Sequence, residues 1–436
     1  MADQRVLLVV HNHPDLLVGG VETYVKNLYD ALSAADGFEP ILLARAGRPF
    51  SPTDAPHEDT ALALVNEDPN QYLLYTQFGD FDQLFGRLEK TKGEIAREFA
   101  GFLLAQRPDV IHFQHTTYLG YDMVRVARNT LPDVPIVYTF QEYWPICHRA
   151  GQMVRTRNNE LCSEESPRRC NECFPEIPSE TFYMRKRFIQ SQLALVDYFI
   201  GPSRFLLGRY VEWGIPPERI LFEDYGFPPV TPAPVKPDAP RNRFGFFGQM
   251  NAYKGVDVLL RAMESLGPDF EGQLSIHGAN YDLAPPELRA ELDNLLDATR
   301  ATATYVGPYK SDDLPRLFEE TDWVVVPSIW WENAPLVISE AFMHGRPVIC
   351  SDIGGMAEKV TDGVDGLHFI RGDHDHLADV LDRAANTPGL WDNLRAGIQS
   401  ANSMEHHVEL LGGLYRRLAA ERAAPPAERI LEEARA

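Results

Sequence analysis

Short apolar runs alternate with longer helix-like stretches along this chain, and this alternation constrains the fold more than any other feature. The expected strands are residues 5–10, 40–44, 110–113, 135–140, 198–202, 243–247, 273–278, 304–306, 323–327 and 347–351. Helices are expected at residues 20–35, 255–266 and 314–320. Strands separated by helices at this spacing predict parallel sheets with helices on both faces. The predicted fold class is α/β, with two doubly wound, Rossmann-like domains facing a cleft.

The composition of the sequence changes at residues 228–240, PPVTPAPVKPDAP, where six of thirteen residues are proline. Such a segment neither continues a helix nor sits inside a sheet, so we interpret it as a semi-rigid linker. It separates an N-terminal, acceptor-side domain (residues 1–227) from a C-terminal, donor-binding domain (residues 241–400). Residues 401–436 are rich in Glu, Arg and Ala and predict helices that cross back to the first domain.

Charge and composition exclude several classes of function. The chain has 63 Asp and Glu against 41 Lys and Arg, a net charge of -22, which disfavours binding along nucleic acid phosphates. Its apolar runs are far shorter than the roughly 18 residues that span a bilayer. The N-terminus shows no secretory signal, so we expect a cytoplasmic protein. Arg185, Lys186 and Arg187 suggest peripheral contact with the inner face of the membrane, although a solvated helix face explains them more simply.

Residues 321–351, TDWVVVPSIWWENAPLVISEAFMHGRPVICS, predict a buried strand, a turn and a helix at about residues 334–344. Asn333 offers an N-cap, and Pro335 falls in the first turn. The apolar body of the helix predicts burial on most sides, which makes Glu340 unusual, because a buried carboxylate needs a partner or a ligand. Glu332 lies just before the N-cap, where the helix dipole attracts anions. Structural ion pairs and a ligand site both explain these two carboxylates.

Glu332 and Glu340 stand eight positions apart in S-x-W-x-E-N-x-P-L-V-I-x-E-A, which resembles the Glu-x7-Glu motif of the family 4 glycosyltransferases of the GT-B fold. Further segments resemble that family in the same order and cover most of residues 6–370: Gly19-Gly20, 202–203, 214–216, 247–249, 254–257 and 354–367. The resemblance implies a retaining transferase that moves a sugar from a nucleotide-diphosphate donor to a glycan, lipid-linked or small-molecule acceptor. It implies no cofactor for the chemistry.

The resemblance also implies a role for each matching residue. Lys254 contacts the donor diphosphate, whose charge grows as it leaves, and Glu332 faces the donor sugar, so these two are the expected catalytic residues. Glu340 binds the ribose hydroxyls, and Gly20 lets the backbone approach the diphosphate closely. The other donor-binding positions that the resemblance supplies are Gly19, Gln249, Asn333, Ala334, Pro335 and Leu336.

Three positions depart from the family pattern. Gln249 stands where the family commonly has Arg, and Gln141 where it commonly has His. The usual Asn before the interdomain glycine is replaced in Asp224-Tyr225-Gly226. These departures keep two alternative functions open, a sugar-nucleotide-binding protein with little or no transferase activity and a sugar-nucleotide isomerase on the same fold. The acceptor-side candidates are His112, His115, Gln141 and Glu142, with satisfied or solvated polar residues as the alternative interpretation.

Four of the five cysteines lie in one polar insertion, residues 147–173: Cys147, Cys162, Cys170 and Cys173. Four thiolates can close a tetrahedral shell around zinc, and in a reducing compartment such a cluster favours a metal over disulfides. We therefore predict a structural zinc ion. An iron-sulfur cluster, a disulfide pair and four free thiols remain the alternatives.

Overall fold

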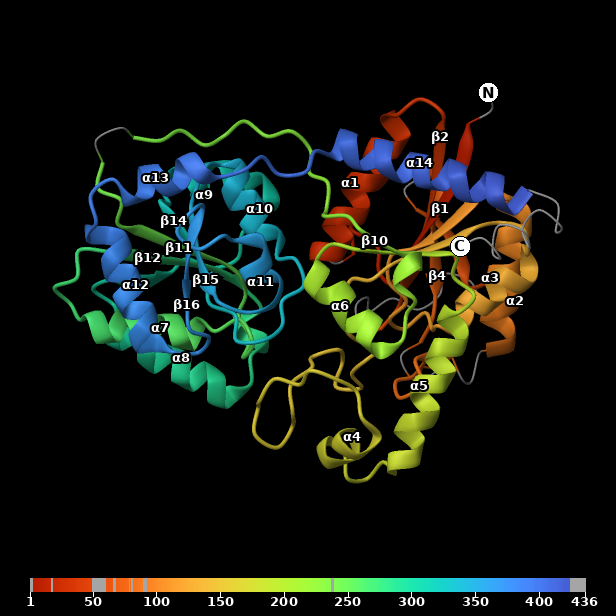
Figure 1. Cartoon of the computed structure of the whole chain (residues 1–436), viewed down its shortest axis with the longest axis horizontal. Coiled ribbons are helices and arrows are strands. Elements are labelled where there is room, and N and C mark those ends of the chain that lie inside the picture. Colours follow the sequence, from red (N-terminus) through yellow and green to blue (C-terminus); the bar gives the residue numbers. More distant parts are fainter. Residues whose placement is uncertain are drawn as a thin grey trace. The chain divides into compact units, whose positions relative to one another are not determined.

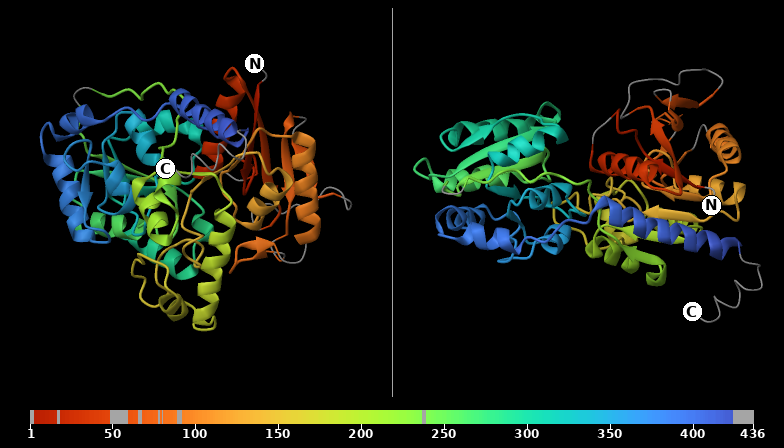
Figure 2. Two further views of the ribbon diagram at one scale, coloured as in Figure 1. Left: turned by 45° about the vertical axis from the view of Figure 1, so that its right-hand side comes forward. Right: turned by 90° about the horizontal axis from the view of Figure 1, so that it is seen from above.

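The computed structural model describes residues 3–16, 19–48, 60–65, 68–77, 79, 81–88, 92–236 and 239–423. The chain divides into two compact units, unit 1 (Met1–Pro228 and Asn402–Ala436) and unit 2 (Pro229–Ala401). Each unit has a mainly parallel sheet covered by helices, as the alternation of apolar runs predicts (Figures 1 and 2). The predicted α/β class with two doubly wound domains is confirmed.

Unit 1 contains an eight-stranded sheet in the order β10-β9-β8-β7-β1-β2-β4-β3, parallel except for β3, which runs antiparallel to β4. Its strands are β1 (Gln4–Val10), β2 (Phe38–Ala46), β3 (Leu62–Val65), β4 (Asp68–Tyr75), β7 (Val110–Phe113), β8 (Ile136–Thr139), β9 (Tyr198–Gly201) and β10 (Ile220–Phe222), with a separate hairpin of β5 (Phe81–Asp82) and β6 (Arg87–Leu88). Its helices are α1 (Gly20–Ala34), α2 (Lys92–Gln106), α3 (Asp122–Thr130), α4 (Pro167–Cys173), α5 (Ser179–Leu193), α6 (Arg204–Trp213) and α14 (Met404–Ala423). The strand order reverses beside β1, which makes the carboxyl ends of β1 and β7 the topological switch point.

Unit 2 contains a six-stranded, fully parallel sheet in the order β13-β12-β11-β14-β15-β16. Its strands are β11 (Arg243–Gln249), β12 (Gln273–Ala279), β13 (Ala303–Tyr305), β14 (Trp323–Val326), β15 (Val348–Ser351) and β16 (Gly366–Phe369). Its helices are α7 (Val256–Leu266), α8 (Pro286–Ala298), α9 (Leu314–Glu319), α10 (Leu336–Met343), α11 (Gly354–Lys359), α12 (His374–Asn386) and α13 (Leu390–Gly397).

Side chains of β14 alternate between two hydrophobic clusters, one on each face of the unit 2 sheet. Trp323 and Val325 contribute to the cluster that includes α7, α8, α12 and α13. Val324 and Val326 contribute to the cluster that includes α9, α10 and α11. Both faces are therefore buried, which explains why this strand reads as an uninterrupted apolar run. With both faces covered by helices, the loops at the carboxyl edge are where unit 2 can hold a ligand.

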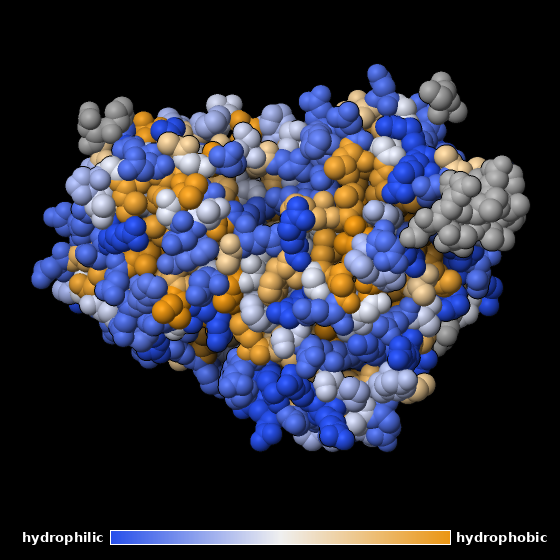
Figure 3. Space-filling view, in the orientation of Figure 1, coloured by the Kyte–Doolittle hydropathy of each residue, from blue (hydrophilic) through white to orange (hydrophobic). Residues whose placement is uncertain are grey.

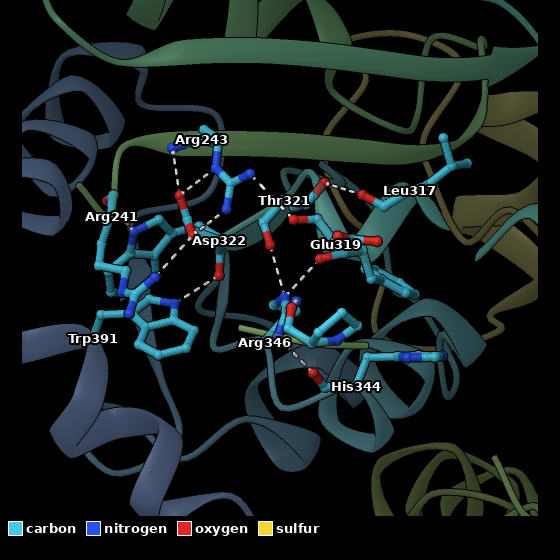
Figure 4. A network of polar contacts seen from close by, with 12 residues as sticks. Arg241, Arg243, Leu317, Glu319, Thr321, Asp322, His344, Arg346 and Trp391 are labelled. Atoms are coloured by element: carbon cyan, nitrogen blue, oxygen red, sulfur yellow. Dashed lines mark hydrogen bonds and ion pairs between the residues drawn. The ribbon is translucent and has the colours of Figure 1, made fainter. Parts of the chain in front are cut away.

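A buried polar network lies at the amino ends of β11 and β14, the edge opposite those loops (Figure 4). Asp322, only 2% exposed, accepts hydrogen bonds from Arg243 at 2.8 and 2.9 Å. Arg241 lies 3.7 Å from the same carboxylate, and the indole of Trp391 donates to the Asp322 backbone carbonyl at 2.8 Å. The carboxylate thus joins the starts of two strands that are 79 residues apart in sequence.

Part of the proline-rich segment is bound to unit 2. The backbone N–H of Ala233 donates to Nδ1 of His344 at 3.0 Å, and Arg346 donates to the carbonyl of Pro234 at 3.0 Å. Arg346 is buried and also donates to the carbonyls of Phe318 and Thr321. The semi-rigid linker expected at residues 228–240 is therefore pinned at residues 233–234.

Helix α14 groups with unit 1, where it packs beside α1 (Figure 1). The hydroxyl of Tyr24 in α1 bonds to His407 of α14 at 2.8 Å. Residues 424–436, also expected to be helical, lie outside the described residues. Within the described part of the chain, no helix combines the length and the apolar character needed to cross a bilayer.

The basic run at residues 185–187 does not present three surface charges. Arg185 is 1% exposed and donates to the backbone carbonyls of Leu84, Pro145 and Trp144 at 2.5–2.8 Å. Lys186 and Arg187 lie over the rings of Trp213 and Tyr183. The suggested membrane contact thus loses one of its three charges to a structural role, because a buried guanidinium with three carbonyl partners cannot also reach a lipid headgroup.

We expect Asp322→Asn to lower the free energy of unfolding by about 3 kcal/mol, because it leaves two half-buried guanidinium groups without their buried carboxylate. Asp297→Asn is the matched control, since Asp297 pairs with Arg300 on the surface and both side chains are about 80% exposed. The control should change stability by less than about 0.5 kcal/mol. Urea denaturation of both variants measures the difference. Equal stabilities would show that the network contributes nothing.

Candidate functional site

Lys254 and Glu332 meet at the carboxyl edge of the unit 2 sheet. Lys254 lies in the loop between β11 and α7, and Glu332 lies in the loop between β14 and α10. The ammonium of Lys254 donates to Oε1 of Glu332 at 2.6 Å. The hydroxyl of Ser328 and the indole N–H of Trp330 donate to the same oxygen at 2.7 and 3.0 Å. The two predicted catalytic residues are thus direct partners.

This arrangement keeps Glu332 ionised. Burial would raise the pKa of its carboxyl, but the charge of Lys254 and the hydrogen bonds from Lys254, Ser328 and Trp330 outweigh burial and lower the pKa below its ordinary value. Lys254 donates one N–H to Glu332, and its side chain is only partly buried. Because an ammonium carries three donors, two remain for an anionic ligand.

Two glycines set the position of these loops. Gly255 follows Lys254 with φ +69°, and a Cβ there would overlap the carbonyl oxygen of Pro327 at the end of β14. A Cβ at Gly355 would overlap the carbonyl oxygen of Asn333, and the Gly355 N–H donates to the carbonyl of Glu332 at 2.9 Å. Both positions therefore need a residue without a side chain.

Helix α10 begins later than the sequence suggests. Pro335, with φ -58° and ψ 118°, is the N-cap, and the helix starts at Leu336. The prediction of Asn333 as the N-cap and Ala334 as helical was wrong, because a residue before proline is disfavoured in the helical region. The helix is also less buried than expected: Ile338, Ser339 and Ala341 are buried, whereas its other residues are half-buried.

Glu340 is half-buried about one turn into α10. Burial raises the pKa of its carboxyl to about 7, against an opposing effect of Lys359. Among the described residues, no side chain donates a hydrogen bond to this carboxyl group. Its neighbour Tyr309 has a raised pKa, first through burial and then through the charge of Glu340. Glu340 can therefore accept hydrogen bonds from a ligand.

The other predicted donor-side residues are divided between the two units. In unit 2, Gln249 is exposed at the last position of β11. In unit 1, Gly19 is the N-cap of α1 and Gly20 is its exposed first residue. The carboxylate of Glu22 fills the space beside Gly19 and forms a 3.0 Å pair with His11. The first turn of α1 thus already holds an acidic side chain.

A polar cluster gathers at the carboxyl ends of β8, β7 and β1 in unit 1. Nε2 of His115 lies 3.9 Å from Oε1 of Glu142, and the ring centroids of His115 and His11 are 4.5 Å apart. Gln141 contacts Gln114 and accepts a hydrogen bond from the hydroxyl of Tyr225. Burial raises the pKa of Glu142 well above its ordinary value, and the charge of Arg185 opposes this shift. Burial lowers the pKa of His115 well below its ordinary value, and the charge of His11 lowers it further.

His112 is engaged by the protein itself. Its Nδ1 bonds to the hydroxyl of Tyr415 and its Nε2 to the hydroxyl of Thr139, both at 2.7 Å. Burial, followed by the charge of His407, lowers the pKa of His112 to about 3. With both ring nitrogens bound, the geometry favours a structural role that ties α14 to the sheet over contact with an acceptor.

The four clustered cysteines line a single cavity in unit 1. Burial raises the pKa of Cys147 to about 11 and that of Cys170 to about 12. Cys162 donates to the carbonyl of Glu164 at 3.2 Å. No three His, Cys, Asp or Glu side chains within the described ranges converge on a common point at metal-binding distance. Cys350 lies apart, buried in β15.

Two family models match the chain in succession. The model for Glycosyltransferase Family 4 matches residues 18–221, and the model for Glycosyl transferases group 1 matches residues 241–387. The chain belongs to the family 4 glycosyltransferases.

Curated relatives of this glycosyltransferase include two D-inositol 3-phosphate glycosyltransferases. The protein from Nocardioides sp. is 26% identical over 430 residues, which cover 92% of this chain and 86% of the relative. The protein from Stackebrandtia nassauensis is 27% identical over 319 residues, covering 66% and 68% respectively.

Solved structures show the same GT-B fold. Sucrose-phosphate synthase from Thermosynechococcus elongatus has a TM-score of 0.66 and 22% identity, covering 96% of this glycosyltransferase and 99% of that chain. Anabaena HepE, solved in complex with UDP, has a TM-score of 0.62 and 14% identity over 95% of this chain and all of its own. The fold named in the sequence analysis is therefore confirmed.

Three residues of the unit 1 cluster in this glycosyltransferase were not predicted from the sequence: His11, Asn12 and Glu22, whose carboxylate pairs with His11. Asn12 is fully buried, and neither polar atom of its amide has a hydrogen-bond partner among the residues that the structure describes. An orphaned buried amide is uncommon and marks a place where a ligand or water completes the bonding. Its position directly after the first apolar run was the available signal, because strand carboxyl ends collect site residues.

We expect Glu340→Gln to stabilise this glycosyltransferase at about pH 8 but not at about pH 5. The folded carboxyl titrates near pH 7 instead of 4.5, so between these values the folded state holds a proton that the unfolded state has lost. Wild-type stability therefore falls as pH rises through this window, by about 2 kcal/mol after allowance for partial solvation. Urea denaturation at both pH values measures it, with exposed Glu287→Gln as the control. A variant that tracks the wild type at both pH values would contradict the raised pKa.

Proposed function

We propose that this chain is a retaining glycosyltransferase that uses a nucleotide-diphosphate sugar. The bond from the anomeric carbon of the sugar to the diphosphate breaks, a bond from that carbon to an acceptor hydroxyl oxygen forms, and the hydroxyl proton is released. The acceptor class is a glycan, a lipid-linked sugar or a small molecule, as in polysaccharide biosynthesis. We place this reaction in the cytoplasm, with at most peripheral membrane contact.

The observation that carries this proposal is the pairing of Lys254 with buried Glu332, eight residues before the unpartnered carboxyl of Glu340. Two free N–H groups of Lys254 suit the leaving diphosphate. The backbone N–H groups of Ala334 and Leu336, on either side of Pro335, lie at the N-terminus of α10, where the helix dipole adds to that charge stabilisation. Glu340 suits the ribose hydroxyls, which donate hydrogen bonds to a carboxylate.

The acceptor side of the proposal rests on unit 1. His115, Gln141 and Glu142 supply hydrogen-bonding groups at adjacent strand ends, beside the unpartnered amide of Asn12. These groups suit the hydroxyls of a polyol or sugar, because each can donate or accept a hydrogen bond without a fixed charge. The two inositol phosphate glycosyltransferases among the relatives act on such a polyol, by their names.

A second function, nucleotide-sugar binding with little transfer, is favoured by one observation. Gln249 is exposed at the end of β11 and supplies no positive charge where the family commonly has Arg. A weaker field at the diphosphate lowers the rate of bond cleavage more than it lowers binding of the intact donor. The two functions therefore separate in a product assay.

A thermal-shift screen of nucleoside diphosphates and their sugars tests the proposal, because a ligand of the native state raises Tm by mass action. We expect at least one of them to raise Tm, and Glu340→Gln to reduce that shift while Glu287→Gln keeps it. Chromatography of the binding donor with and without acceptors then shows transfer. Binding without product favours the second function, conversion of the donor without acceptor favours an isomerase, and no binding contradicts the donor site.

We expect Lys254→Met to act on both stability and turnover, and a double variant separates the two effects. The single variant unpairs buried Glu332, so stability should fall by roughly 2 kcal/mol and turnover on the order of 100-fold. Adding Glu332→Gln removes the buried charge and should restore Tm but not turnover. Denaturation and steady-state kinetics measure the two. Recovery of turnover together with Tm would make Lys254 a purely structural partner.

A further inference from the structure

The segment between β8 and α5 carries the four cysteines, and its buried apolar side chains, among them Tyr143, Ile146, Met153 and Val154, all lie before residue 155. Cys162 follows a short antiparallel bridge between Val154 and Leu161, and its backbone N–H donates to Met153 at 2.7 Å. Helix α4 has no buried residue. Figure 3 shows a largely hydrophilic surface over this segment, at the bottom of the view. Apolar burial therefore contributes little to the order of residues 155–173, which carry three of the four cysteines.

This poorly supported segment nevertheless gathers its four thiol side chains around one cavity. Cys147, Cys162, Cys170 and Cys173 all line it, although up to 26 residues of sequence separate them. The cavity volume is about 30 Å³, which is enough for one small ion or one water molecule. Cys170 and Cys173 approach it from one turn of α4, and Cys147 and Cys162 approach it from the two loops before that helix.

We propose that Cys147, Cys162, Cys170 and Cys173 bind one zinc ion as four thiolates. Four sulfur ligands complete a tetrahedral shell and leave no open position, so the site is structural. Binding breaks four S–H bonds, releases four protons to solvent and forms four Zn–S bonds, leaving a net charge of -2 on the site. Arg149, Arg155 and Arg169 line the cavity together with Glu164 and Glu165. Arg155 and Arg169 already pair with Glu172 and Glu164, so the lining offsets only part of that charge.

Zinc binding requires side-chain rotation, because the thiols face the cavity without converging on one point. Cys162, for example, must exchange its hydrogen bond to the Glu164 carbonyl for the metal. Rotation about χ1 moves a sulfur by a few Å, and the four cysteines are half-buried instead of enclosed in the core. The binding free energy of a structural zinc is of the size that orders a short segment with no core of its own.

The proposed zinc also has a consequence for the acceptor side. Glu142, which ends the turn after β8, accepts a hydrogen bond from the backbone N–H of Trp144. Gly151 packs against the same carboxylate, 2.6 Å from where its Cβ would stand, and its N–H donates to the carbonyl of Cys147 at 3.0 Å. A metal that fixes Cys147 therefore fixes the loop that positions Glu142.

Elemental analysis of the full chain, purified without added metal or chelator, tests the proposal. We expect about one zinc per chain, because four thiolates complete one tetrahedral zinc site. Cys170→Ala with Cys173→Ala should lose the zinc and lower Tm, whereas Cys350→Ala should keep it, since Cys350 is a buried thiol outside the cluster. If the double variant fails to fold, wild-type protein gives the same answer: a chelator should release zinc to an indicator dye and expose four additional reactive thiols.

Three outcomes overturn the proposal: metal-free protein with four titratable thiols and undiminished stability, iron with visible absorbance in place of zinc, or disulfides in freshly purified protein. The metal measurement does not depend on transferase activity, so it can fail while the proposed function stands. Conversely, the nucleotide-induced Tm shift reports on unit 2, and we expect the zinc-free variant to keep it.

Discussion

The candidate donor site depends on two backbone contacts that are too close for any side chain. Gly255 touches the carbonyl of Pro327, and Gly355 touches the carbonyl of Asn333. The first contact holds the loop after β11 against the end of β14, and the second holds the loop after β14 against the start of α11, so that Lys254 reaches Glu332 at 2.6 Å. A charge-assisted hydrogen bond weakens steeply with distance, and a Cβ at either glycine would force the loops apart. The geometry of the site thus requires that neither position carries a side chain.

Within this frame, two carboxylates eight residues apart acquire opposite properties. Glu332 is 7% exposed, and three donors lower its pKa, whereas Glu340 has no donor and burial raises its pKa to about 7. Environment alone separates them, because the side chains are identical. A permanently charged Glu332 can orient Lys254 in the absence of ligand, while Glu340 is poised to gain hydrogen bonds when a ligand arrives.

Periodicity predicted most strands to within two residues, because apolar runs report burial directly. It failed for β4 (DPNQYLLY), whose half-buried, polar residues lack such a run. The apolar pattern of the helix predicted Glu340 as a buried carboxylate, whereas Glu340 is half-buried and Glu332 is the more buried of the two. Long-range polar partners were beyond its reach: nothing local to Asp322 or Arg185 indicates the groups 79 and 101 residues away that they bind. The site's residue types could be predicted, but their pairing required the fold.

The departure from the family pattern at Gln141 and the pKa values of its neighbours Glu142 and His115 have the same consequence for the acceptor proton. Gln141 keeps hydrogen bonds to Gln114 and Tyr225, but an amide cannot take up a proton. Its neighbour Glu142 has a raised pKa, which favours the protonated form, and the lowered pKa of His115 makes that ring a weak base. These three groups can orient an acceptor hydroxyl but are poor acceptors of its proton. Within the proposed function, the proton is then best taken by the leaving diphosphate, whose oxygens gain charge as the sugar departs.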